Sequence, residues 1–335
     1  MPAAREQRSA HMQKKISVSL CVVIALIAAA TVQAQERKPY RIGVIHEGGP
    51  YSRAIDGLKD ALRSAGLEPG KDVILEVRDT QGNRVSIGDV ARSLEESKVN
   101  LLCTISTTVT LAAKAATKQV PIVFAIGTDA AAQGLVESLA KPGGRLTGVQ
   151  RLSSDFTGKR LEILKEMLPA LRRVVTFYDP GDNVARQAAK LAQEASRKLK
   201  IELKEEPVSS VAELRQAINR LDRKDADAFV YVSDAMVTTQ SRFIIDTAKV
   251  KKLPTMFSEP ELVTQGALAA YGVSLYDEGR LLAKYVQRVL SGNNPKDLPI
   301  ESFSKYELGI NLGTARELGI TIPQAVLFRA DKVVE

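Results

Sequence analysis

Residues 101–129 have the sequence LLCTISTTVTLAAKAATKQVPIVFAIGTD, and this stretch decides the expected fold. Residues 101–105 and 120–126 are short apolar runs typical of buried strands, and residues 109–116 between them have the composition of a helix. A strand, a helix and a second strand in this order form a parallel pair with a helical crossover. The stretch therefore predicts an α/β fold whose parallel sheet is covered by helices.

The same alternation continues on both sides of this stretch. In the first half we expect strands at 40–46, 73–77 and 146–149, and helices at 52–65, 87–94 and 130–139. In the second half we expect strands at 174–178, 201–204, 228–232, 254–257, 267–271 and 306–310, and helices at 161–168, 184–199, 211–221, 238–250, 275–290 and 315–318. About a dozen strands are too many for one compact unit. The pattern thus predicts two Rossmann-like lobes that separate near residues 149–154.

The N-terminal segment has the features of an export signal. Lys14 and Lys15 precede an almost wholly apolar or small run at 16–32, which ends in the small-residue pattern Val32-Gln33-Ala34. We expect residues 1–34 to be a leader and signal peptide cleaved near Ala34, with Met12 as an alternative start. The mature protein would then be periplasmic, although an uncleaved membrane anchor is the alternative for this run.

Charge and composition exclude several classes of function. The whole chain carries a net charge of +8, and cleavage after residue 34 removes four basic residues and one acidic residue to leave +5. This mild, dispersed charge suits solubility and predicts no nucleic-acid partner. Cys103 and His46 are the only residues of their types after cleavage, so neither a disulfide nor an ordinary transition-metal site is expected. Phosphate-loop, dinucleotide and nucleophile-elbow motifs are absent, and we expect no cofactor and no enzyme activity.

Ligands of open α/β sheets bind beyond the carboxyl ends of the strands, so the residues that follow each strand are the candidate site. On the first lobe, Ser106, Thr107 and Thr108 open a helix, where hydroxyls and free N–H groups suit a carboxylate. Gly127 lets a ligand approach the backbone closely, and Asp129 follows it. Plain helix capping is the alternative for the hydroxyl residues and for Asp129.

On the second lobe, the candidate residues include several carboxylates. Asp179 and Asn183 follow the strand at 174–178, and Asp234 follows the strand at 228–232. A carboxylate in this position suits an ammonium group. Glu259 and the phenol of Tyr271 complete the set. A turn at residues 179–182 with Asn183 as a helix cap is the alternative. Hydroxyls on one lobe and carboxylates on the other suit a zwitterion held between them.

Several segments carry a resemblance to a known family. They are GLKDAL at 57–62, PIVFA at 121–125, GLVESLAKPGGRLTGV at 134–149, KRLEILKEMLP at 159–169 and GINLGTARELGITIP at 309–323. With them the chain resembles the ABC-transporter substrate-binding proteins of the tryptophan/tyrosine-binding type. The resemblance implies a type I periplasmic-binding fold, an amino-acid-like ligand in the cleft and a membrane permease as partner. We expect the protein to act as a monomer.

The resemblance is uneven at the candidate site. Asp179 stands where family members often carry Asn, and Gln150 and Arg151 replace the usual small polar residues. An Arg151 that faces an acidic ligand is one interpretation of this departure. A solvent-facing Arg151 is the expectation from its residue type.

The family fold implies capture by hinge closure. We expect three crossings near residues 149–153, 258–266 and 294–302, with lobe 1 at 38–150 and 265–297 and lobe 2 at 151–264 and 298–335. Ligand contacts from both lobes would favour the closed state. A sensory binding protein that reports to a receptor and, less favoured, an exported enzyme on the same fold are the alternatives.

Overall fold

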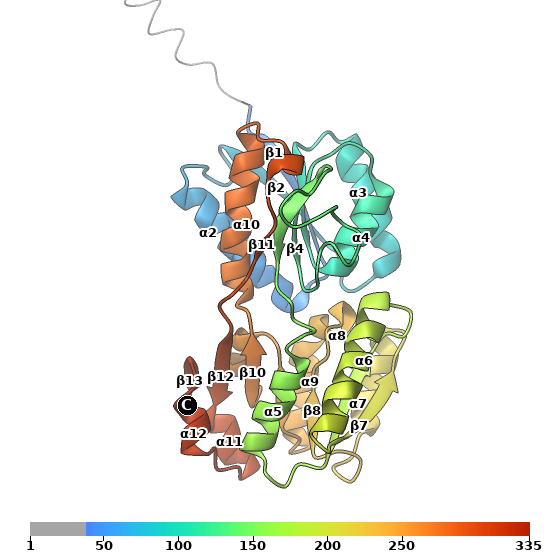
Figure 1. The fold of residues 1–335 in the computed structure, drawn as a ribbon, viewed down its shortest axis with the longest axis vertical. Helices are drawn as coiled ribbons and strands as arrows, with labels where there is room; N and C mark the ends of the chain where they lie inside the picture. The colour runs from blue at the N-terminus through green and yellow to red at the C-terminus, as the bar shows by residue number, and fades with distance from the viewer. Residues whose placement is uncertain (1–37) are drawn as a thin grey trace, which may run out of the picture. The chain divides into compact units, whose positions relative to one another are not determined.

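The computed structural model describes residues 38–335, which form two sheets with helices on both faces of each (Figure 1). The predicted fold class, two α/β lobes with largely parallel sheets, is confirmed. The expected signal peptide at 1–34 lies outside the described residues. Within residues 38–335, none of the helices is long and apolar enough to span a membrane.

Lobe 1 contains a six-stranded sheet with the order β11-β5-β4-β3-β1-β2. The bounds of its strands, in chain order, are Tyr40–His46, Val73–Asp79, Leu101–Ile105, Ile122–Ile126, Leu146–Gln150 and Glu301–Ser302. Helices α2 (Ser52–Ser64) and α10 (Leu275–Leu290) share one apolar core with the sheet, and α3 (Arg84–Glu96) and α4 (Thr107–Ala116) share another. Figure 1 shows these two pairs on opposite faces of the sheet. Short 3-10 turns, η2 (Gly49–Tyr51) and η4 (Pro295–Asp297), follow β1 and α10.

Lobe 2 contains a seven-stranded sheet with the order β13-β12-β10-β9-β8-β6-β7. Its strands β6 to β10, β12 and β13 span Arg173–Tyr178, Glu202–Pro207, Ala228–Val230, Thr255–Phe257, Ala269–Gly272, Glu307–Asn311 and Lys332–Val334. All pairs are parallel except β10 with β12. Its helices α5 to α9, α11 and α12 span Thr157–Met167, Asn183–Lys198, Val211–Arg220, Ala235–Thr239, Ser241–Val250, Leu312–Leu318 and Gln324–Leu327, and η3 spans Pro260–Gln265.

The chain crosses between the sheets three times, but two crossings differ from the prediction. The first follows β5, at residues 151–156. The predicted crossing at 258–266 is wrong, because β10 pairs with β9 and β12 in lobe 2 and the chain leaves only at 272–275. The third crossing lies at 302–307, since β11 still pairs with β5 of lobe 1. Residues 265–272 therefore belong to lobe 2, and residues 298–302 belong to lobe 1.

Two local predictions are also wrong. Residues 130–139 form a series of turns instead of a helix, and residues 238–250 contain two helices that meet at Gln240. His46, in the strand expected at 40–46, does end β1; it is buried and accepts a hydrogen bond at Nδ1 from the Gly48 N–H. Apolar spacing alone does not distinguish compact turns from a short helix.

Candidate functional site

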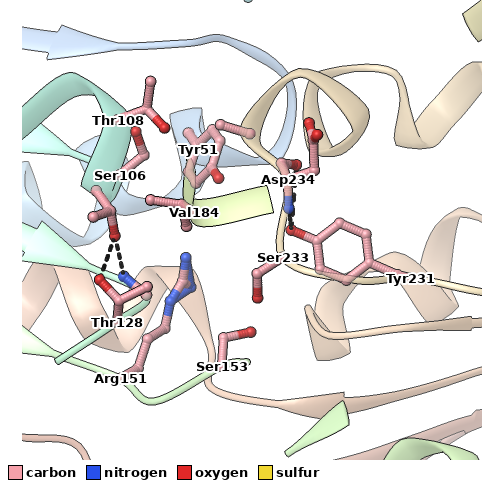
Figure 2. Close-up of a pocket in the computed structure, with 13 residues that line it drawn as sticks. Tyr51, Ser106, Thr108, Thr128, Arg151, Ser153, Val184, Tyr231, Ser233 and Asp234 are labelled. Carbon is pink, nitrogen blue, oxygen red and sulfur yellow. Dashed lines mark hydrogen bonds between the residues drawn. The ribbon is translucent and has the colours of Figure 1, made fainter. Parts of the chain in front are cut away.

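A cavity lies between the two lobes, at the carboxyl ends of their strands (Figure 2). Its volume is about 30 Å³, room for about two water molecules, so a small-molecule ligand requires the lobes to move apart. Its walls come from lobe 1, from the first crossing and from lobe 2: Tyr51, Ser106, Thr107, Thr108, Gly127, Thr128, Arg151, Ser153, Val184, Tyr231, Ser233, Asp234 and Ala235. Five predicted residues are thus brought together here: Ser106, Thr107, Thr108, Gly127 and Asp234.

The three predicted hydroxyls of lobe 1 all have partners inside the protein. The Ser106 hydroxyl donates to Glu47 at 2.6 Å and accepts from the Val109 N–H, which caps α4. The Thr107 hydroxyl pairs with that of Thr128 at 3.0 Å. The Thr108 hydroxyl donates across the cleft to Asp182 at 2.8 Å. Capping and cross-cleft bonding therefore occupy the groups that were expected to receive a carboxylate.

Ser106 has a strained backbone. Its φ of 106° lies in a region that residues with a side chain rarely adopt. The hydrogen bonds of its side chain to Glu47 and to the first turn of α4 hold it there. Such strain persists only where surrounding contacts determine the conformation, and it is concentrated at ligand sites.

Glu47 is fully buried behind Ser106. Burial raises the pKa of its carboxyl to about 8, although the Ser106 hydrogen bond lowers it. Asp234 and Asp182, across the cleft, add to the increase in this pKa. Glu47 is therefore mainly protonated at neutral pH, and its Oε1 has no hydrogen-bond partner within the described residues.

The substitution Glu47→Gln is expected to reduce the pH dependence of stability. The folded protein keeps the Glu47 proton up to about pH 8, whereas the unfolded chain loses it near the ordinary value of 4.5. Between these values, ionisation of the unfolded chain lowers the wild-type free energy of unfolding by up to about 1.4 kcal/mol per pH unit. The variant should therefore gain stability relative to wild type as the pH rises from 4.5 to 8.

Urea unfolding at several pH values across this window tests the effect. Glu96→Gln, at an exposed position on α3, is the matched control and should show a constant difference from wild type. A Glu47→Gln difference that does not change with pH would contradict a buried, protonated Glu47.

Asp234 lines the cavity and also accepts hydrogen bonds from the backbone of lobe 2. Its carboxylate accepts from the Asp179 N–H at 2.6 Å and from the Val237 N–H at 2.8 Å, which caps α8. Burial raises the pKa of Asp234 to about 6, against the effect of these backbone bonds. At neutral pH the carboxylate is therefore mainly ionised, and its remaining lone pairs suit a cation.

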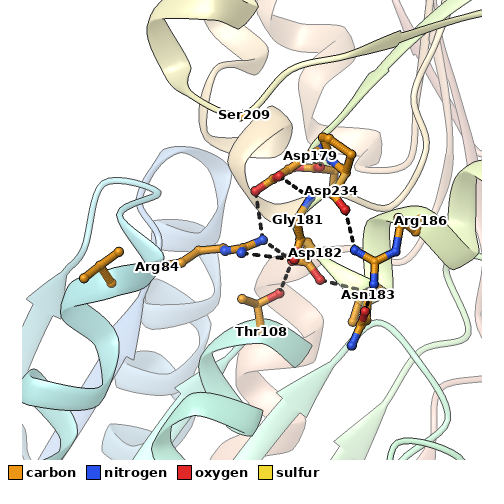
Figure 3. A network of polar contacts seen from close by, with 12 residues as sticks. Arg84, Thr108, Asp179, Gly181, Asp182, Asn183, Arg186, Ser209 and Asp234 are labelled. Atoms are coloured by element: carbon orange, nitrogen blue, oxygen red, sulfur yellow. Dashed lines mark hydrogen bonds and ion pairs between the residues drawn. The ribbon is translucent and has the colours of Figure 1, made fainter.

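Asp179 and Asn183 do not line the cavity. Asp179 pairs with Arg84 of α3 at 2.8 Å, an ion pair between the lobes (Figure 3). The alternative role of Asn183 as a helix cap is also wrong, because Asp182 accepts from the Val184 N–H and takes that position. The exposed Asn183 instead contacts Arg186.

The remaining predicted residues also lie outside the cavity lining. Asp129 accepts from the Ala132 N–H and stabilises a turn. Tyr271 packs against Phe156 and Tyr306. Glu259 is buried nearby, and burial raises its pKa although Arg151 lowers it.

The predicted set omits several lining residues, above all Arg151, whose contact with a ligand was only one interpretation of the sequence. Only 6% of Arg151 is exposed, so the expectation that it faces solvent is wrong. Tyr51, Thr128, Ser153, Tyr231 and Ser233 were also absent from the predicted set. Arg151 directly follows β5, so the rule that found the other residues also points to it. Among residues 38–335, no cluster of side chains suits a metal ion.

The chain is similar to known proteins over almost all of the residues that the structure describes. The family model described as "ABC transporter substrate binding protein" matches residues 41–334. A curated relative from Clostridioides difficile, named "Tyrosine-binding protein", is 27% identical over 85% of this chain and 82% of its own length.

Solved structures show the same similarity. A conserved domain protein from Vibrio cholerae is 30% identical, with a TM-score of 0.81 over 88% of this chain and 100% of its own. An ABC domain from "Streptococcus pneumonia" in complex with L-Trp is 25% identical, with a TM-score of 0.79 over 89% of this chain and 100% of its own. The ligand-free, open structure of CD0873 from Clostridium difficile is 23% identical and shares the fold, with a TM-score of 0.59 over 88% of this chain and 99% of its own.

Proposed function

The chain belongs to the family of ABC transporter substrate-binding proteins, and we propose that it captures an amino-acid-like ligand between its lobes for an importer in the membrane. The predicted family is thereby confirmed. The observation that carries the proposal is the cavity whose walls come from both lobes. A ligand in this position contacts both lobes at once, so its binding favours the closed arrangement.

Contacts between the lobes support a capture mechanism by hinge closure. The Arg84–Asp179 ion pair and the Thr108–Asp182 hydrogen bond join lobe 1 to lobe 2 beside the cavity (Figure 3). Opening the cleft must break both, and both are partly exposed to water. Pairs of this kind contribute little free energy each, so they permit opening and leave the ligand to determine the closed population.

The lining of the cavity supports an amino-acid-like ligand. Asp234 offers a carboxylate for an ammonium group, Arg151 offers a cation for a carboxylate, and Tyr51 and Tyr231 offer aromatic surface. The names of two relatives include tyrosine and L-Trp.

The remaining features of the proposal follow from the transporter role. The N-terminal segment at 1–34 would direct export to the periplasm, where the closed protein would dock on a permease. We propose that it acts as a monomer, binds no nucleic acid, and releases its ligand chemically unchanged. The relatives are solute-binding proteins, which supports a role without catalysis.

Ligand binding tests the proposed function. Native mass spectrometry of purified residues 35–335 should show a co-purifying small molecule, and calorimetry with the L-amino acids should identify at least one that binds with a sub-micromolar Kd. That affinity corresponds to more than about 8 kcal/mol. Failure of every amino acid to bind would contradict the ligand class, and conversion of a bound compound would contradict a role without catalysis.

A further inference from the structure

Arg151 is a buried cation whose guanidinium N–H groups have no hydrogen-bond acceptor within the described residues. Its guanidinium points into the cavity, as Figure 2 shows, and its Nε is a buried donor without a hydrogen-bond partner among residues 38–335. Ser233, on the opposite wall, also has a buried hydroxyl without a partner in this part of the chain. Buried polar groups are almost always hydrogen-bonded, so these unpaired donors indicate that a ligand in the cavity supplies an acceptor.

The charges around Arg151 do not replace such an acceptor. Its nearest acid, Glu278 of α10, is fully buried and lies at 3.5 Å from Arg151 Nε to Glu278 Oε1. Neither carboxylate oxygen of Glu278 has a hydrogen bond within residues 38–335. Burial raises the pKa of Glu278 to about 7, although Arg151 lowers it. Burial thus weakens Glu278 as an acid, and no hydrogen bond within residues 38–335 joins it to Arg151.

Two further charged groups face this region from lobe 2. Glu259 lies near both Arg151 and Arg160, and burial raises its pKa. Arg160 of α5 adds a second buried cation. Around Arg151, two arginines that stay protonated therefore face two buried acids whose pKa burial raises. This balance favours an anion beside Arg151, whereas the Asp234 carboxylate elsewhere in the lining suits a cation.

We propose that Arg151 is the specificity-determining residue of this site: it receives the anionic carboxylate of the ligand, and Glu278 is a positioning residue that orients it. The inference rests on the proposed function for the rest of the ligand. A guanidinium presents a planar pair of donors that matches a carboxylate in two parallel hydrogen bonds. The hydroxyls of Ser106, Thr107 and Thr108 do not take this role, because each is hydrogen-bonded to another side chain of the protein.

The position of Arg151 also connects recognition to closure. It is the first residue of the crossing that follows β5, and its N–H donates to the Ile126 carbonyl at 2.8 Å. Ser153, two residues further along the same crossing, also lines the cavity. A carboxylate on Arg151 thus binds the segment that must bend when the lobes move.

Matched pairs of ligands test the inference by calorimetry. L-tryptophan is compared with L-tryptophanamide, and L-tyrosine with L-tyrosinamide, because each amide keeps the ring and the ammonium but lacks the anion. A third pair, indole-3-propionate and its amide, lacks the ammonium as well. In the wild type we expect at least one acid to bind about 100-fold more tightly than its amide, which corresponds to about 2.7 kcal/mol.

Variants separate the proposed role from general packing. Arg151→Gln should reduce the preference for acid over amide to less than about fivefold, and Arg151→Lys should retain about tenfold because it keeps the charge without the planar fork. Glu278→Gln should reduce the preference several-fold, which a purely structural role would not do. Arg242→Gln, at an exposed position on α9, is the control and should leave the preference unchanged.

The outcomes distinguish this inference from the proposed function. Equal binding of acid and amide by the wild type, or a full preference retained by a folded Arg151→Gln, would overturn the role of Arg151. If no amino acid binds the wild type, the proposed function fails. The indole-3-propionate pair then tests on its own whether Arg151 binds a carboxylate. In that case, absence of a preference for the acid overturns the inference too.

Discussion

Replacing Gly279 with alanine is expected to lower the free energy of unfolding by about 3 kcal/mol, because α10 packs on α2 without room for a side chain. A Cβ on Gly279 would lie 1.8 Å from the Ala54 carbonyl oxygen. Gly57, on α2, has the reciprocal position: its Cβ would lie 1.9 Å from the Tyr276 carbonyl oxygen. Both obstacles are backbone atoms, so a rotamer change cannot relieve the overlap and the helices must separate.

The separation of α2 from α10 would disturb the core on that face of lobe 1. Leu58 and Leu282, each fully buried, belong to the core cluster that these helices share with the sheet. In an exposed helix, Gly→Ala would stabilise the protein by up to about 1 kcal/mol. Helix propensity alone would raise the free energy of unfolding of the variant. A decrease therefore results from the steric contact between the two helices.

Gly158→Ala is the matched control for this prediction. Gly158 lies in the helix α5, and a Cβ there would have ordinary contact with the Ala195 Cβ at 3.5 Å. We expect this variant to be neutral or slightly more stable than wild type. Urea unfolding followed by circular dichroism measures both variants, and equal effects at the two glycines would contradict close packing of α2 on α10.

The periodic parts of the fold were predictable from the sequence. The helix expected at 275–290 matches α10, and the strand expected at 101–105 matches β3. Both are long or strongly apolar segments, where local pattern and tertiary environment agree. The lobe of each strand was less predictable. β10 is as apolar as its neighbours, and only its pairing with β9 and β12 shows that it belongs to lobe 2.

The candidate site was partly predictable for a similar reason. The carboxyl ends of parallel strands converge in this fold class, so Ser106, Gly127 and Asp234 meet at one cavity. The rule gives no side-chain direction, and Asp179 turns to Arg84 instead. Arg151 was left out of the predicted set because arginine is rarely buried without a partner. Its partner Glu278 comes from a distant helix, which no local pattern indicates.

Arg160 joins two of the segments that connect the lobes. Its guanidinium donates to the Ser153 carbonyl at 2.7 Å, in the first crossing, and to the Tyr271 carbonyl at 3.3 Å, just before the second. A third bond reaches the Thr157 hydroxyl at 2.9 Å. The side chain is fully buried, and burial lowers its pKa to about 10, so it remains a cation at neutral pH. The first two crossings are thus held together by one buried cation.

The substitution Arg160→Met is therefore expected to lower the free energy of unfolding by about 3 kcal/mol and to weaken ligand binding. Methionine fills much of the same space but donates no hydrogen bond, so the Ser153 and Tyr271 carbonyls lose a buried donor. Glu259 also loses one of the two cations that lower its pKa. Arg242→Met on the surface of α9, where Arg242 pairs with Asp246, should change stability by less than about 0.5 kcal/mol.

Urea unfolding and calorimetry separate the two effects of Arg160→Met. If Arg160 determines only stability, the variant at low temperature, where it is still folded, should bind ligand as the wild type does. If it also fixes the relative positions of the crossings, the Kd should rise at least tenfold under the same conditions, because ligand binding must then order the hinge. We expect the second result, since Ser153 lies both in the cavity wall and under the Arg160 guanidinium. A folded variant with wild-type stability would contradict the structural role of this buried cation.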